Sequence, residues 1–157
     1  MKVKLICCGK TVDSFLVQGE INYQNRLKHY FSFDRIDLPD LKNTKNLSAE
    51  QIKEEEGKRI LKEIQPNQEL ILLDERGKNF TSIEFSEFLT NHFNYNQRDL
   101  IFLIGGPYGF SDKVYERANS KMSLSKMTFS HQMVRMIFLE QLYRASTIMK
   151  GEPYHHE

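Results

Sequence analysis

The run from Asp99 to Gly109, D-L-I-F-L-I-G-G-P-Y-G, constrains the fold more than any other stretch of the chain. Its first part, Leu100 to Ile104, is an unbroken apolar segment, as expected for a β-strand that is buried on both faces. Three glycines then follow within five residues, and they allow the backbone to turn tightly and to approach a ligand closely. Ser111 can cap the helix that comes next. Such a strand, glycine loop and helix start are typical of the ligand-binding edge of an open α/β sheet.

Strand and helix patterns alternate along the rest of the chain. Apolar runs predict strands over 3–8, 33–38, 70–73 and 100–104, and a short strand or extended loop over 122–127. Apolar spacing and capping residues predict helices over 14–30, from 48 to about 64, after Thr81, from 111 to about 120, and from 130 to about 150. This alternation predicts one α/β domain over residues 1–157, with a mostly parallel sheet covered by helices on both faces.

Charge and cysteine usage exclude several classes of protein. The net charge is only +1, which argues against generic nucleic-acid binding but leaves room for a specific, shape-fitted RNA contact. Cys7 and Cys8 are neighbours in a predicted strand, so they point to opposite faces and make a poor pair of metal ligands. No disulfide framework, signal peptide or membrane-spanning run is recognisable. We therefore expect a cytoplasmic protein without a metal site or membrane attachment.

The glycine loop matches neither common phosphate-binding motif. It lacks the Gly-Lys-Ser/Thr ending of a P-loop and the G-x-G-x-x-G of a dinucleotide fold. A purely structural turn therefore remains open. Two companion segments favour a ligand: the strand at 70–73 ends in a turn with Gly77, and Leu124 to Phe129 precedes the last helix in the same way. Three such loops at one sheet edge would offer backbone amides and few charges, which suits an adenosine-like ligand better than a polyphosphate.

The titratable candidates are few. Asp74 is explained as well by a helix-capping or loop-stabilising role as by chemistry, and His131 as well by a solvated or capping role. The tail carries Tyr154, His155 and His156, which are aromatic rings able to stack on a base or, alternatively, part of a disordered end. Arg135 and Arg144 on the last helix can contact phosphate, or face solvent or a dimer partner.

The last predicted helix carries apolar residues around more than half of its circumference. A helix that packs on one side of a sheet needs a narrower apolar stripe. The extra surface predicts a second partner, which is either a second copy in a symmetric dimer or another helix of the same chain.

Taken together, these residues resemble the ribosomal RNA large subunit methyltransferase H family, the small knotted (SPOUT-class) enzymes that modify 23S rRNA. The resemblance covers essentially the whole chain. It is carried by Leu72-Leu73-Asp74 with Gly77, Leu103 to Gly109, Ser123 to Thr128, His131 with Val134-Arg135, Glu140 to Ala145, and Pro153-Tyr154-His155. Two positions depart from the family pattern. Ser130 stands where a proline is common, and His156 stands where another basic residue commonly precedes the final glutamate.

The resemblance implies a C-terminal trefoil knot that holds S-adenosylmethionine in a bent conformation. By motif, the cofactor-binding residues are Leu73, Gly105, Leu124, Ser125, Lys126, Met127, Thr128 and Phe129. It also implies a homodimer across the last helix. The family's substrate is a pseudouridine in the helix 69 loop of 23S rRNA, methylated at N3 on the assembled 70S ribosome.

On this reading, the N3 proton must be removed, and we expect His155 to handle it while Tyr154 stacks on or orients the base. Arg135, Arg144 and His156 are the expected RNA contacts. A pure RNA-binding role for the tail explains the same residues. Two alternatives for the whole chain are a catalytically silent, dimeric ribosome-binding factor and a related knotted methyltransferase that acts on tRNA. Unlike the silent factor, an enzyme predicts a buried adenosine pocket.

Overall fold

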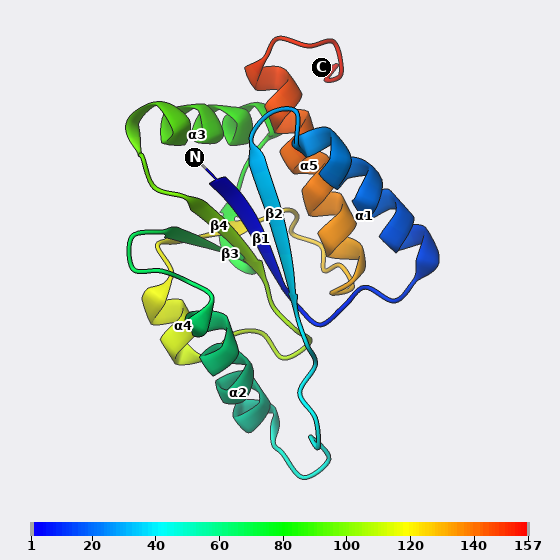
Figure 1. Ribbon diagram of the computed structural model, residues 1–157, viewed down its shortest axis with the longest axis vertical. Coiled ribbons are helices and arrows are strands. Elements are labelled where there is room, and N and C mark those ends of the chain that lie inside the picture. Colours follow the sequence, from blue (N-terminus) through cyan, green and yellow to red (C-terminus); the bar gives the residue numbers. More distant parts are fainter. Residues whose placement is uncertain (1, 157) are drawn as a thin grey trace.

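A five-stranded parallel sheet forms the middle layer of the protein, as the computed structural model shows for residues 2–156 (Figure 1). The strand order is β2-β1-β4-β3-β5. The strands are β1 (Lys2–Cys8), β2 (Ser32–Leu38), β3 (Glu69–Asn79), β4 (Leu100–Ile104) and β5 (Ser120–Ser123). The predicted parallel α/β sheet is therefore confirmed, and every strand pair in it is parallel.

Helices cover both faces of this sheet. One face carries α1 (Ser14–Leu27), α3 (Ser82–Tyr95) and α5 (Met133–Met149), and the other carries α2 (Ala49–Lys62) and α4 (Asp112–Arg117) (Figure 1). Successive residues of β4 point to opposite faces, so Phe102 packs with Phe138 of α5 whereas Leu103 packs in the second core with Ile60 and Val114. A strand that supplies two cores must be apolar at every position, which explains the unbroken run from Leu100 to Ile104.

Three helix starts follow the capping residues read from the sequence, whereas Ser111 stands at the N-cap of α4 without a capping hydrogen bond from its side chain. Ser48 Oγ accepts a hydrogen bond from the Gln51 amide at 3.1 Å, and the Gln51 side chain accepts one from the Ser48 amide at 2.9 Å. Thr81 and Glu84 make the same reciprocal pair before α3. Ser130 Oγ accepts from the Met133 amide at 3.1 Å. It therefore bonds to the first residue of α5 across the turn at residues 131 and 132. The helices themselves are shorter at their ends than the sequence predicts, and α1 ends at Leu27.

Strand β3 departs from the prediction. We expected a strand over 70–73 followed by a glycine turn, but β3 continues to Asn79. Leu73 and Lys78 both pair with Met122 of β5, so the four residues between them bulge out of the ladder. A Cβ on Gly77 would lie 2.5 Å from the Met122 carbonyl carbon. Gly77 therefore serves the close approach of two strands, and it does not form a turn.

Helix α5 lies between α1 and α3 and contacts both (Figure 1). The two neighbouring helices cover much of the apolar surface that seemed too wide for a helix on one side of a sheet. The width of that surface is therefore explained within the chain, and it no longer supports a dimer by itself. None of the helices in the described part of the chain is long and apolar enough to cross a membrane.

We expect Gly77→Ala to lower the free energy of unfolding by about 2–3 kcal/mol, because its methyl group would strike the backbone of β5. Gly109→Ala is the control. Its φ is +79°, and among the described residues nothing lies within 4 Å of an added Cβ, so only the backbone cost of about 1 kcal/mol applies. Urea unfolding of both variants measures the difference, and equal losses would contradict the close approach.

Candidate functional site

A cavity of about 800 Å³ opens at the carboxyl edge of the sheet. Its walls come from the bulged part of β3 (residues 73–76), the loop Ile104–Phe110 after β4, and the segment that joins β5 to α5. The three segments predicted to converge therefore meet at one cavity. Of the residues that the sequence assigned to a cofactor, the following line it: Leu73, Gly105, Leu124, Ser125, Met127, Thr128 and Phe129. Lys126 is exposed and lies outside the lining.

The glycine loop is shaped by the residue packed beneath it. A Cβ on Gly105 would lie 2.8 Å from the ring of Phe110, which is itself buried in the second core. A Cβ on Gly106 would lie 3.1 Å from Glu56 of α2. Gly109 adopts φ +79°, a conformation that side chains with a Cβ rarely take. The missing side chains therefore let Gly105 and Gly106 pack closely on Phe110 and Glu56 while the loop lines the cavity.

A polar cluster lies on the cavity wall beside this loop, where the Tyr115 ring packs edge-on against Phe110. Tyr115 of α4 donates a hydrogen bond from Oη to the Asp74 carboxylate, and Arg76 Nη2 donates to the same Oη at 2.8 Å. Burial alone would raise the pKa of Asp74, but the hydrogen bonds from Tyr115 and Arg76 outweigh it and hold the pKa below its usual value. Asp74 therefore stays ionised and braces the bulge of β3, which is the loop-stabilising role left open above. Tyr115 and Arg76 were not predicted, because the contact with α4 spans a long stretch of sequence without any local pattern.

The C-terminal tail is docked against the end of α5. The Tyr154 ring packs edge-on against Tyr143, with centroids 4.8 Å apart, and the Arg144 guanidinium lies 4.8 Å from the centre of the Tyr154 ring. Tyr154 Oη donates to Glu140 at 3.1 Å. Burial and hydrogen bonding with Tyr23 and Glu140 raise the pKa of Tyr154, so its phenol stays protonated near neutral pH. The side chain of His155 is half-buried beside Arg144.

The tail and the cavity lie at opposite ends of α5. His131 and Val134 line the cavity at the start of the helix, whereas Tyr154 packs near its last turns. The 17 residues of α5 span about 25 Å. Figure 1 shows the tail beyond the final turn of α5. Within one chain, the structure therefore does not bring Tyr154, His155 or His156 to the cavity.

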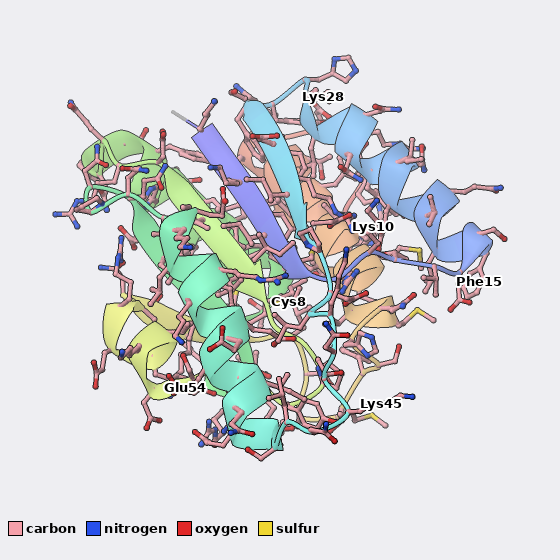
Figure 2. All side chains as sticks on the ribbon, turned by 60° about the horizontal axis from the view of Figure 1, so that its bottom comes forward. Cys8, Lys10, Phe15, Lys28, Lys45 and Glu54 are labelled. Carbon is pink, nitrogen blue, oxygen red and sulfur yellow. The ribbon has the colours of Figure 1, made fainter. Side chains whose placement is uncertain are left out.

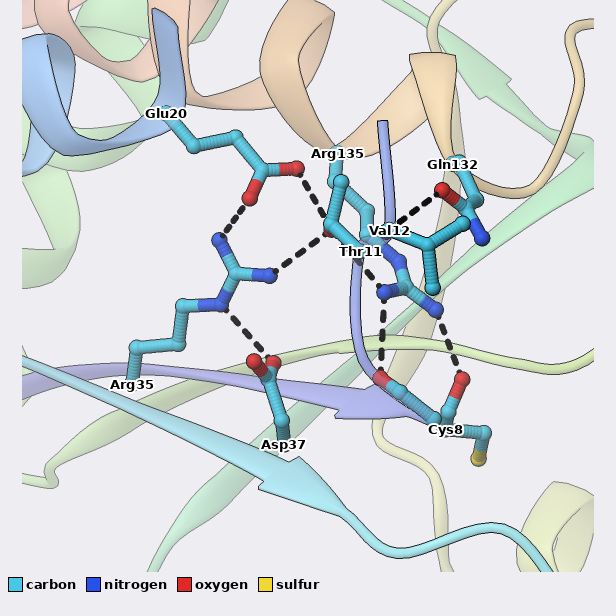
Figure 3. Close-up of polar contacts among 9 residues, drawn as sticks. Cys8, Thr11, Val12, Glu20, Arg35, Asp37, Gln132 and Arg135 are labelled. Atoms are coloured by element: carbon cyan, nitrogen blue, oxygen red, sulfur yellow. Dashed lines mark hydrogen bonds and ion pairs between the residues drawn. The ribbon is translucent and has the colours of Figure 1, made fainter. Parts of the chain in front are cut away.

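The structure corrects the expectation that Arg135 contacts RNA. Its side chain is fully buried, and its guanidinium donates to the carbonyl oxygens of Cys8 and Gly9 at 2.6 and 3.0 Å (Figure 3). It also donates to Thr11 Oγ1 at 3.1 Å. These bonds leave Arg135 without access to a phosphate group. Arg144 is half-buried and paired with Glu140 at 2.6 Å, and His156 is exposed, so both remain available to RNA.

The adjacent cysteines are part of the core. Cys7 belongs to the core beneath α5 and Cys8 to the core beneath α2, as expected for neighbours in a strand. Burial raises the pKa of each thiol to about 12, so both stay protonated and unreactive. In the described part of the chain, no group of three or more His, Cys, Asp or Glu side chains is placed to hold a metal ion.

A parallel α/β sheet with a glycine-walled cavity at its carboxyl edge defines a ligand-binding α/β protein. Comparison with known proteins narrows this class. A family model described as "Predicted SPOUT methyltransferase" matches residues 1–155. The chain is 55% identical over 157 residues to "Ribosomal RNA large subunit methyltransferase H" of Parabacteroides distasonis, with 100% of both chains covered. It is 56% identical over 156 residues to the protein of the same name in Cytophaga hutchinsonii, covering 99% of this chain and 100% of that one.

The chain therefore belongs to the SPOUT methyltransferase family. A search of solved structures finds the SpoU methyltransferase AviRb of Streptomyces viridochromogenes, in complex with AdoMet, at a TM-score of 0.44 and 11% identity. That match covers 96% of this chain and 61% of the other, and its TM-score is too low to support a detailed comparison.

We expect Arg135→Ala to lower the free energy of unfolding by about 2–4 kcal/mol, because it removes three hydrogen bonds and leaves buried carbonyl groups unpaired. Arg144→Ala is the matched control on the same helix. Its ion pair with Glu140 is partly exposed, so the expected loss is at most about 1 kcal/mol. Urea unfolding measures both losses. A small loss of unfolding free energy for Arg135→Ala would contradict the buried, hydrogen-bonded position of its side chain.

Proposed function

We propose that this chain is an S-adenosylmethionine-dependent methyltransferase that acts on N3 of a pseudouridine in the helix 69 loop of 23S rRNA, on the assembled ribosome. The observation that carries the proposal is the cavity at the carboxyl edge, because the segments that line it are those that the family resemblance assigns to the cofactor. The names of the relatives support a large-subunit rRNA substrate. A silent ribosome-binding factor would not need such a cavity.

The cavity fits the proposed cofactor. Its volume of about 800 Å³ lies within the range of small-molecule sites. Gly105 and Gly106 line it, and a side chain at Gly105 would strike Phe110. Leu73, Leu124 and Phe129 supply apolar walls for an adenine ring. When bound, S-adenosylmethionine supplies a methyl group on a cationic sulfur, and positioning the acceptor and removing its proton fall to the chain.

The tail residues divide these tasks by their chemistry. Tyr154 keeps its phenolic proton and donates it to Glu140, so it orients the base through its ring and cannot act as the proton acceptor. His155 is the proposed acceptor for the N3 proton. Its Nδ1 lies 3.5 Å from Arg144 Nη1, and because an arginine can only donate, the Nδ1 lone pair accepts this bond in the neutral ring. Nδ1 would have to release Arg144 before it takes the N3 proton. Arg144 and His156 are the proposed RNA contacts of the tail.

The distance between tail and cavity supports a site that is built from two copies of the chain. In the proposed homodimer, the N-terminal halves of α1 and α5 contact the same helices of the second copy. The twofold axis makes the paired helices antiparallel across the interface. The tail of one copy would then approach the cavity of the other. Exposed apolar side chains at that end support this contact: Val12 is 75% exposed, Phe15 60% and Met127 76%. Val12 is held beside the start of α5 by a bond from its amide to Gln132 at 2.9 Å.

The proposed reaction is tested by methyl transfer from labelled S-adenosylmethionine. We expect label in 70S ribosomes, little in free 23S rRNA, and none in tRNA. Ribosomes that carry uridine in place of the target pseudouridine are the control, and we expect them to accept far less label. Transfer to tRNA alone would favour the tRNA enzyme, and no transfer to any substrate would favour the silent binding factor.

Mixed dimers test whether the tail and cavity of different copies form one site. We expect Gly105→Val to block cofactor binding, and His155→Ala to lose turnover while it still binds the cofactor in calorimetry. Neither variant alone should transfer methyl groups. Mixed in equal amounts and allowed to exchange, they should recover about one quarter of wild-type activity. The reason is that half of the dimers are mixed and each has one intact site.

The mixture discriminates sharply between the two arrangements. If cavity and tail of the same chain formed the site, every site in a mixed dimer would carry one defect, and no activity would return. Gly105→Val protein that is taken through the same exchange without His155→Ala is the control. Any methyl transfer that it gains comes from the procedure and not from mixed dimers. Normal cofactor binding by Gly105→Val would count against the cavity itself.

A further inference from the structure

The end of α1 lies against the docked tail. Tyr30, just beyond α1, donates a hydrogen bond from Oη to Glu152 of the tail. The Glu152 amide in turn donates to the carbonyl oxygen of Thr147 in α5, at 3.0 Å. The ring centroid of Tyr23 lies 6.0 Å from that of Tyr143, which packs on Tyr154. The end of α1 and the tail therefore present one continuous surface.

Arg26 is stacked on this surface and exposed. Its guanidinium carbon lies 5.3 Å from the centre of the Tyr143 ring and 5.9 Å from that of Tyr23. The residue as a whole is exposed, so the face of the guanidinium turned away from the rings is open to solvent. A guanidinium plane held on aromatic rings is a platform on which an unpaired base can stack.

Positive charge is concentrated around this platform. Lys28 is exposed at the end of α1, and Lys150 is exposed at the end of α5. Two carboxylates lie nearby. Glu140 pairs with Arg144, whereas Glu152 accepts from the neutral phenol of Tyr30 and keeps its charge, but Arg26, Lys28 and Lys150 outnumber it. In a chain whose net charge is only +1, such a local excess marks a surface suited to a polyanion.

We propose that Arg26 and Lys28 form an RNA-docking surface that continues from the tail, with Arg26 stacking on an unpaired base and Lys28 contacting a backbone phosphate. The proposal rests on the rRNA substrate of the proposed function, and it adds α1 to the residues that hold that substrate. The surface acts in binding and not in methyl transfer, since it lies at the end of α1 and carries no group that touches the cofactor cavity.

The variants are Arg26→Ala, Arg26→Lys and Lys28→Ala, with Lys45→Ala as the control. Lys45 is an exposed lysine at the opposite end of the molecule from Lys28, as Figure 2 shows. The Lys45→Ala substitution therefore removes one positive charge at a site far from the proposed surface. Two quantities are measured for each variant: KM for 70S ribosomes together with kcat, and affinity for protein-free 23S rRNA at several salt concentrations. Calorimetry with S-adenosylmethionine alone checks that the cavity is intact.

We expect Arg26→Ala to bind rRNA about tenfold more weakly and to raise KM in proportion, with kcat nearly unchanged. Lys28→Ala should reduce the slope of log affinity against log salt by about one. Arg26→Lys should keep the salt slope but recover only part of the affinity, because a lysine keeps the charge and loses the stacking plane. Lys45→Ala should match the wild type in every measurement.

Equal behaviour of Arg26→Ala, Lys28→Ala and Lys45→Ala would overturn the proposal. A rise in KM for ribosomes with unchanged affinity for protein-free rRNA would also overturn it, because the contact would then be to a ribosomal protein. The two proposals can fail separately. If the wild type transferred no methyl group to any substrate while the variants still lost rRNA affinity, the proposed function would fall and the docking surface would stand.

Discussion

A single buried guanidinium, that of Arg135, holds the end of β1 against the start of α5. The residues it joins are more than a hundred positions apart in the chain, and its bonds reach the carbonyl oxygens of Cys8 and Gly9. A charge in a protein core is costly unless its hydrogen bonds are satisfied. Both terminal nitrogens of Arg135 have hydrogen-bond partners, and its Nε has none among the described residues. Because α5 directly follows the segment from Leu124 to Phe129, this anchor also sets the position of one cavity wall.

The anchor is part of a larger polar network that ties four elements together. Thr11 Oγ1 accepts from Arg135 at 3.1 Å and from Arg35 at 3.3 Å, and it donates to Glu20 at 2.9 Å. Arg35 of β2 also pairs with Glu20 of α1 and with Asp37, at 2.6 and 2.8 Å (Figure 3). One hydroxyl group thus links the buried Arg135 and the half-buried Arg35. The loop after β1 and the first turn of α5 are held as one unit, and α5 transmits that position along its length to the tail.

Features with a local cause could be predicted from the sequence, and features that depend on distant contacts could not. The strand at Leu100–Ile104 and the two capping boxes follow from neighbouring residues, and the shared cavity follows from the rule that parallel strands end at one edge. The bulge of β3 depends on its pairing with β5 far along the chain. The burial of Arg135 was missed because arginine is ordinarily a surface residue, and only the fold reveals the carbonyl groups that receive it. The knot, the dimer and the roles of the tail residues stay predictions.

The near-neutral charge of the chain and the length of α5 bear on the same question, which is how a small protein handles a large RNA. The cavity occupies the carboxyl edge of the sheet, whereas the exposed cations at the ends of α1 and α5 lie at the opposite edge. Helix α5 separates the cavity from the exposed cations. The positive potential that would attract RNA therefore lies away from the cofactor cavity. In the proposed homodimer, the twofold symmetry would bring the basic end of one chain to the cavity of the other. On this view, dimerisation supplies the substrate side of the site, and a chain of this size needs no separate RNA-binding domain.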